Sequence, residues 1–193
     1  MPSDPLSQAI EHFRSGRIAD AEERCRFLLA GSPDHPEANH LLGAICFQQN
    51  RFVEALAYLK RAAGSPEATA EMHNHLGSAY SRLGETQKAA EAFERAIAIK
   101  PGYADALHNL GVVYGKMQKK DEALNNLRSA VALKPELLQE NPDLRGLYHG
   151  VVPGWHFAMT AHINLTLTDD YPLAQALVII EAVAEPSQRK ENS

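Results

Sequence analysis

A repeat of 34 residues is the feature that most constrains the fold of this chain. Small residues recur at that step in three separate columns of the sequence. The columns are Ala21, Ala55, Ala89 and Ala123, then Gly43, Gly77 and Gly111, and then Ala62, Ala96 and Ala130. Several columns that share one period are very improbable by chance, so we expect the chain to fold as a stack of similar units.

Each unit is predicted to contain two amphipathic helices joined by a short turn. In the third unit, apolar residues follow helical spacing over 70–83 and again over 87–99. The column between the two helices comprises Gly16, Asn50, Gly84 and Gln118. Glycine and asparagine readily adopt the left-handed conformation that closes a helix, whereas Gln118 fits this column less well. Small residues where the paired helices cross are expected to let them approach closely.

The third unit contains Leu76-Gly77-x-x-Tyr80 and Ala89-x-x-x-Phe93, which resemble the pattern of the tetratricopeptide repeat family. The resemblance implies an all-α fold, a right-handed superhelical array of four helix-turn-helix repeats. The expected repeats are 2–35, 36–69, 70–103 and 104–135.

By this resemblance, the first helix of each repeat lines a concave groove that binds a peptide or a protein segment. The candidate groove residues are His40, Gln48, Asn74, His75, Ser78, Arg82, His108, Asn109 and Lys116. One column holds Arg14, Arg82 and Lys116, interrupted by Gln48, and we expect this basic stripe to favour an acidic segment or a C-terminal carboxylate. The alternative is that these cations are solvated helix ends.

Two subfamilies provide comparisons for this groove. Repeats that bind the C-termini of heat-shock chaperones use a Lys/Asn/Asn/Lys/Arg clamp, and this chain has no complete version of it. Repeats of the O-linked N-acetylglucosamine transferase hold a peptide backbone with a ladder of asparagines. Asn74 and Asn109 resemble a fragment of that ladder, which Leu41 interrupts.

Composition excludes several classes of partner. The formal net charge of -5 argues against nucleic acid. No apolar run approaches the roughly 18 residues that span a bilayer, and the N-terminus lacks a secretory signal, so no membrane contact is expected.

Cys25 and Cys46 fall at core columns and are predicted to be buried thiols in a reducing compartment, which indicates a cytoplasmic protein.

We predict no catalytic residue, no cofactor and no metal site. His73 and His75 are two residues apart on a helix and so face different directions. His40 and His108 lie two repeats apart. The sequence also lacks a Ser–His–acid arrangement, paired carboxylates and a phosphate-binding glycine loop, so the chain is not expected to be an enzyme.

The period is lost after the fourth repeat. Residues 136–186 are expected to form an irregular segment and a capping helix, and 187–193 a disordered tail. Apolar residues cover nearly the whole circumference of the helix predicted over 172–185. Such a helix is too apolar for a cap with a polar outer face alone, so it is expected to be buried on both sides or to dock on another chain. We expect a cap on the last repeat, with a homodimer contact or contact with an absent domain as the alternative.

Residues 151–159 contain a Trp-His-Phe-x-Met motif that resembles a segment of protein arginine methyltransferases with N-terminal tetratricopeptide repeats. No glycine-rich turn for S-adenosylmethionine follows it. Two functions therefore stay open. The chain is either an adaptor that binds a protein segment in its groove, or the substrate-recruiting arm of a methyltransferase or glycosyltransferase whose catalytic domain is absent from this chain.

Overall fold

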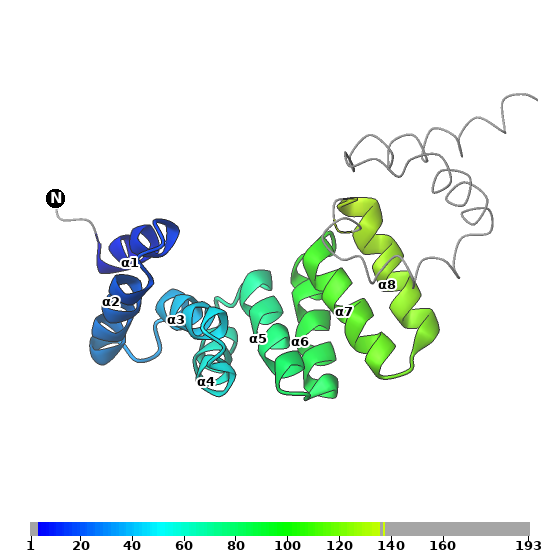
Figure 1. The fold of residues 1–193 in the computed structure, drawn as a ribbon, viewed down its shortest axis with the longest axis horizontal. Coiled ribbons are helices and arrows are strands. Elements are labelled where there is room, and N and C mark those ends of the chain that lie inside the picture. The colour runs from blue at the N-terminus through cyan, green and yellow to red at the C-terminus, as the bar shows by residue number, and fades with distance from the viewer. Residues whose placement is uncertain (1–3, 136, 138–193) are drawn as a thin grey trace, which may run out of the picture. The chain divides into compact units, whose positions relative to one another are not determined.

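The described residues of this computed structural model, 4–135 and 137, contain eight α-helices and form the array in Figure 1. The helices are α1 (Pro5–Arg14), α2 (Ile18–Gly31), α3 (Pro36–Gln48), α4 (Phe52–Ala63), α5 (Ala70–Arg82), α6 (Thr86–Ile99), α7 (Ala104–Lys116) and α8 (Lys120–Leu133). Two helices fall within each repeat expected from the period, so the all-α prediction is confirmed. The predicted helices of the third unit, 70–83 and 87–99, agree with α5 and α6 to within one residue.

Residues 4–127 form one compact unit, in which the helices pack in chain order. Helices α1 and α2, α3 and α4, and α5 and α6 form contacting pairs, and each pair contacts the next through α2–α3, α4–α5 and α6–α7. The first helices also contact one another, α1 with α3, α3 with α5 and α5 with α7. This second set of contacts brings equivalent faces of successive first helices side by side.

The glycine column marks the closest approach of the two helices within a repeat. A methyl group on Gly43 would lie 2.6 Å from Cγ of Leu59, and one on Gly77 would lie 2.6 Å from the ring of Phe93. These distances are far shorter than the usual contact between carbon atoms. The packing reason expected for the small residues is therefore confirmed.

The turn column adopts the same backbone conformation in all four repeats. The φ angles are 76° at Gly16, 61° at Asn50, 79° at Gly84 and 62° at Gln118. In each turn the next residue donates its backbone N–H to the carbonyl five positions earlier, as Lys119 does to Tyr114 at 2.9 Å. This bond closes the helix in the manner of a Schellman motif. Gln118 therefore adopts the left-handed backbone conformation of the other three turn residues, although a residue with a Cβ disfavours this conformation.

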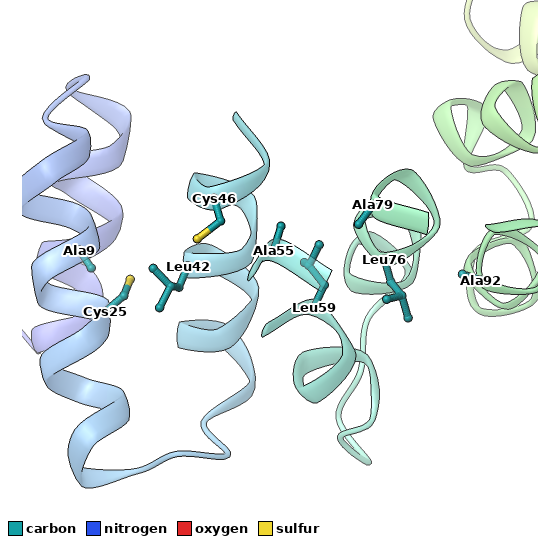
Figure 2. Close-up of a cluster of buried hydrophobic side chains, with 9 residues drawn as sticks. All are labelled: Ala9, Cys25, Leu42, Cys46, Ala55, Leu59, Leu76, Ala79 and Ala92. Carbon is teal, nitrogen blue, oxygen red and sulfur yellow. The ribbon is translucent and has the colours of Figure 1, made fainter. Parts of the chain in front are cut away.

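The core is continuous from one repeat to the next. Figure 2 shows one cluster whose members come from α1 through α6. Its buried residues are Ala9, Cys25, Leu42, Cys46, Ala55, Leu59, Leu76, Ala79 and Ala92. Cys25 and Cys46 are free, buried thiols, as predicted, and burial raises the pKa of each to about 11. Each repeat completes its core only by stacking on its neighbours.

Four predictions for the C-terminal part fall outside the described residues. They are the capping segment over 136–186 apart from Leu137, the tail over 187–193, the homodimer contact through 172–185 and the motif over 151–159. All four stay predictions.

Candidate peptide-binding groove

The candidate groove is formed by the adjacent faces of α3, α5 and α7, because these first helices contact in series. Residues one column apart on successive helices meet across the repeat boundary. The pairs His40–His75 and Asn74–Asn109 are both separated by 35 residues, one more than the period. The structure therefore brings together four of the predicted groove residues as two bonded pairs.

His40 of α3 and His75 of α5 share a hydrogen bond. Nε2 of His40 lies 2.7 Å from Nδ1 of His75, and the ring centroids are 4.8 Å apart. Burial, assisted by the charge of His75, lowers the pKa of His40 to about 4, and burial lowers the pKa of His75 as well. Both rings are therefore neutral at pH 7, so that one nitrogen donates and the other accepts.

Asn74 is part of a second contact between repeats. Its side chain is only 6% exposed, and its Oδ1 accepts a hydrogen bond of 3.1 Å from Nδ2 of Asn109. Its own Nδ2 lies 3.5 Å from the hydroxyl of Tyr103. The asparagine therefore joins α5 to α7 instead of extending into the groove as a ladder residue would. Asn109 is half-buried and retains an exposed part.

A recess of about 200 Å³ opens between α3, α5, α6 and α7. It is lined by Phe47, Ser78, Ser81, Arg82, Phe93, Asn109 and Val112. Three of the predicted groove residues, Ser78, Arg82 and Asn109, meet here. The sequence did not predict Phe47 or Val112 at this site, although they share the columns of Ser81 and Ser78, because both are apolar. Phe93 was predicted only as a residue of the repeat pattern.

The basic column lies on the exposed ends of the first helices. Arg14, Gln48, Arg82 and Lys116 are all exposed. The guanidinium carbon of Arg82 lies 4.8 Å from the ring centroid of Phe52, which fixes the position of this cation through a cation–π contact. Of these four residues, Arg82 lines the recess.

The remaining predicted residue, His108, is half-buried on α7 and does not line the recess. The structure does not bring it to His40, in agreement with their separation by two repeats. Within 4–135 and 137, no three histidine, cysteine or acidic side chains converge in a geometry that could hold a metal ion.

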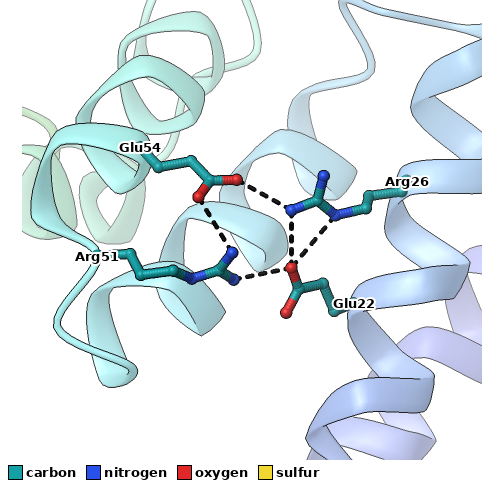
Figure 3. Close-up of polar contacts among 4 residues, drawn as sticks. All are labelled: Glu22, Arg26, Arg51 and Glu54. Carbon is teal, nitrogen blue, oxygen red and sulfur yellow. Dashed lines mark hydrogen bonds and ion pairs between the residues drawn. The ribbon is translucent and has the colours of Figure 1, made fainter.

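Sequence reasoning missed an ionic cluster between the first two repeats, shown in Figure 3. Arg26 contacts Glu22 at 2.8 Å and Glu54 at 3.0 Å, and Arg51 contacts the same two carboxylates at 2.8 and 3.0 Å. Burial opposes ionisation of Glu22, but hydrogen bonds from Arg26 and Arg51 outweigh it and lower the pKa of Glu22. The Glu22–Arg26 pair within α2 and the Arg51–Glu54 pair at the start of α4 were visible as spacings of four and three residues.

Comparison with known families identifies the repeats. One tetratricopeptide repeat profile matches residues 6–69, a TPR repeat profile matches 77–118, and another tetratricopeptide repeat profile matches 104–137. Together the three matches cover most of the described chain.

Solved structures of MamA have a similar fold. One crystal structure of MamA matches with a TM-score of 0.66 and 27% identity, and covers 74% of this chain and 83% of that chain. Residues from 41 to the end of MamA from Desulfovibrio magneticus RS-1 match with a TM-score of 0.62 and 21% identity, over 70% of this chain and 78% of that one. The similarity to the Desulfovibrio magneticus protein, at 21% identity, supports a shared fold and no shared function.

Short matches also occur to Holo-[acyl-carrier-protein] synthases. The protein of Phenylobacterium zucineum (strain HLK1) is 60% identical over 45 residues, which are 23% of this chain and 30% of that protein. That of Sphingopyxis alaskensis is 60% identical over 35 residues, 18% of this chain and 24% of that protein. The chain thus spans less than a third of these curated relatives, and the matches assign it no catalytic activity. No helix among the described residues has the length and apolarity to cross a bilayer.

Proposed function

The chain belongs to the tetratricopeptide repeat family and is a protein-interaction scaffold, and on that premise we propose that it binds an acidic protein segment in the groove of α3, α5 and α7. The observation that carries the proposal is the position of Arg82. This exposed cation stands at the rim of the recess, and Lys116 occupies the same column one repeat later.

Charge supports an acidic ligand. Among the described residues, neither Arg82 nor Lys116 takes part in an ion pair, so both remain able to bind an external carboxylate. Charge-assisted hydrogen bonds from such cations are about twice as strong as neutral ones. The carboxylate would come from aspartate, glutamate or a chain terminus of the partner. The site calls for no cofactor and no catalytic residue.

The second function, a substrate-recruiting arm, would use the same groove. It rests on the resemblance of residues 151–159 to a segment of methyltransferases. Purification of the protein from its cells separates the two functions. An arm would bring a catalytic subunit with it in constant proportion, whereas an adaptor would bring ligands that compete for the groove.

The experiment that tests the groove is affinity capture followed by a binding measurement on each captured protein. The double variant Arg82→Glu/Lys116→Glu reverses the charge of the basic column. Arg24→Glu/Arg61→Glu makes the same change at exposed cations of the second helices and serves as the control. Asn74 is left unchanged because it is buried between repeats.

We expect the groove variant to lose partners that the wild type and the control retain, with affinity falling at least tenfold. Isothermal titration with purified partners measures this loss. Equal affinity for all three proteins would show that the partner binds elsewhere and would remove the proposal. Circular dichroism and thermal unfolding of both variants confirm that they fold alike.

A further inference from the structure

We propose that the recess beside Arg82 is a socket for one apolar side chain of the bound segment, and that Arg82 binds a carboxylate next to that side chain. This inference rests on the proposed function and names the motif that the groove selects. The motif is a leucine- or methionine-sized residue with a carboxylate within two positions of it. The carboxylate can belong to an acidic side chain or to the end of the partner chain.

The size of the recess favours a single side chain over a small molecule. Its volume is about 200 Å³. Sites for cofactors and drug-sized ligands have volumes of roughly 300–1,000 Å³ and enclose most of the ligand. A recess below that range, opening onto a groove between helices, has room for one aliphatic side chain while the peptide backbone stays outside.

The walls of the recess combine apolar and polar side chains. Phe47 and Val112, both half-buried, supply aromatic and aliphatic surface, and Phe93, which is only 1% exposed, closes the recess from the core side. Burial of an apolar side chain against such a surface is favourable in proportion to the area removed from water.

The polar groups of the lining suit a peptide backbone. Ser78, Ser81 and Asn109 line the recess together with the apolar residues. The hydroxyl of Ser78 donates to the carbonyl of Asn74 at 3.0 Å, so its oxygen still has acceptor capacity for a peptide N–H. Asn109 donates one amide hydrogen to Asn74 and keeps its carbonyl for the same use. The lining therefore provides hydrogen-bonding partners beside an apolar side chain.

Arg82 is positioned before any ligand binds. Its guanidinium lies 4.8 Å from the Phe52 centroid, and Phe52 packs edge-on against Phe47, with centroids 5.3 Å apart. The aromatic contact uses the face of the guanidinium, whereas hydrogen bonds to a carboxylate use its N–H edge. A cation held in this way loses little freedom on binding. Because Phe47 lines the recess, the socket and the cation belong to one packed group.

Spacing within an extended peptide follows from this arrangement. Alternate residues of an extended chain point to the same side, about 7 Å apart, and neighbours point to opposite sides. One side chain can therefore enter the recess while the side-chain carboxylate two residues away, on the same side of the peptide, reaches Arg82 at the rim. A terminal carboxylate belongs to the main chain and can reach Arg82 from the next residue. A carboxylate without an apolar neighbour would leave the recess unfilled.

The test selects peptides from a phage-displayed library of random dodecapeptides on the full chain. The same selection is run on Ser81→Leu, which fills the recess and keeps the charge, and on Arg82→Gln, which removes the charge and keeps the recess. Ser32→Leu, at an exposed position away from the groove, controls for the added leucine. Thermal unfolding of each protein shows that its fold is intact.

We expect the wild type and Ser32→Leu to enrich an aliphatic residue within two positions of an acid. Ser81→Leu should lose the aliphatic preference and Arg82→Gln the acidic one. Synthetic peptides then measure the effect by fluorescence anisotropy. Replacement of the aliphatic residue by alanine should weaken binding about tenfold. Free-acid and amidated versions of each peptide show whether a side chain or a terminus supplies the carboxylate.

The test distinguishes failure of the socket from failure of the proposed function. The socket would be contradicted if the acidic peptides require Arg82 but show no aliphatic preference, or if they bind Ser81→Leu as tightly as the wild type. The proposed binding of acidic segments in the groove would still hold. Both the proposed function and the socket would be contradicted if peptide affinity is unchanged in Arg82→Gln and in Arg82→Glu/Lys116→Glu. They would also be contradicted if the selection enriches no acidic peptide.

Discussion

Two glycines four residues apart in α7 differ in what surrounds them. A methyl group on Gly111 would lie 2.6 Å from Cγ of Leu127 and 3.0 Å from the backbone oxygen of Ala123. A methyl group on Gly115 would meet nothing within 4 Å. The same substitution therefore tests helix propensity at one position and helix packing at the other.

We expect Gly111→Ala to lower the free energy of unfolding by about 1–3 kcal/mol, because the added methyl group forces α7 and α8 apart. Gly115→Ala should raise it by about 0.5–1 kcal/mol, since alanine restricts the unfolded chain and favours the helix. Urea unfolding of the two variants beside the wild type measures both effects. If both substitutions stabilised the protein, Gly111 would not mark a close approach.

At the scale of the helical elements, the turn between the two helices of a repeat requires a left-handed residue whatever the side chain. Gln118 has a φ of 62°, a conformation that a residue with a Cβ adopts at a cost of about 1–2 kcal/mol. The backbone bond from Lys119 to Tyr114 holds it there. The fourth repeat therefore retains a strain that glycine removes in the first and third.

We expect Gln118→Gly to stabilise the protein by about 0.5–1 kcal/mol. Gln49→Gly provides the control, because Gln49 precedes the corresponding turn residue and has an ordinary φ of -84°. That change should destabilise the protein, since glycine there only increases the freedom of the unfolded chain. Thermal unfolding midpoints measure the two shifts, and a loss of stability in Gln118→Gly would contradict the strain.

The His40–His75 bond joins α3 to α5 and makes their packing sensitive to acid. The pKa of His40 is about 4 in the fold and 6.5 in an unfolded chain. Between these values the unfolded state binds more protons than the folded state, so stability falls as the pH is lowered. Glu37 and Glu71 raise the pKa of His40 but do not overcome its burial.

We expect the free energy of unfolding to decrease by on the order of 2–3 kcal/mol as the pH falls from 6.5 to 4, because one pKa unit corresponds to about 1.4 kcal/mol. His40→Asn removes the larger part of this dependence and leaves that of His75. Urea unfolding at a series of pH values checks the slope. The same slope in wild type and variant would show that other groups produce it.

For the whole molecule, stability in a repeat array is built from contacts between neighbours. The cluster of Glu22, Arg26, Arg51 and Glu54 joins the first repeat to the second, and α1 and α2 have a following repeat but no preceding one among the described residues. The side chain of Glu22 is 18% exposed and carries three of the contacts. Loss of its charge should therefore loosen the N-terminal repeat first.

We expect Glu22→Gln to speed amide hydrogen exchange in α1 and α2 and to leave α5–α7 almost unchanged. The local loss should be about 1 kcal/mol, since the cluster is partly open to solvent. Glu23→Gln, the adjacent and exposed residue, is the control. Exchange measured by mass spectrometry locates the effect. Equal acceleration in every helix would show that the array unfolds as one unit.

The sequence by itself determined the repeat, the paired helices and the places where glycine or a left-handed residue stands. Each of these depends on local spacing, or on the conformation of one residue, and recurrence at 34 residues multiplies the signal. Cys25 and Cys46 were correctly predicted to be buried thiols. The column of Cys25 also holds the buried residues Leu59, Phe93 and Leu127, so its place in the core follows from the repeat.

Only the tertiary structure decided which of the predicted groove residues line the recess and which bond to one another. The contacts of His40 with His75 and of Asn74 with Asn109 both span 35 residues, because each first helix packs one column out of register with the next. The 34-residue repeat of the sequence does not reveal this shift of one residue between contacting positions. The recess beside Arg82 likewise draws its walls from four helices, and its shape follows from how those helices pack.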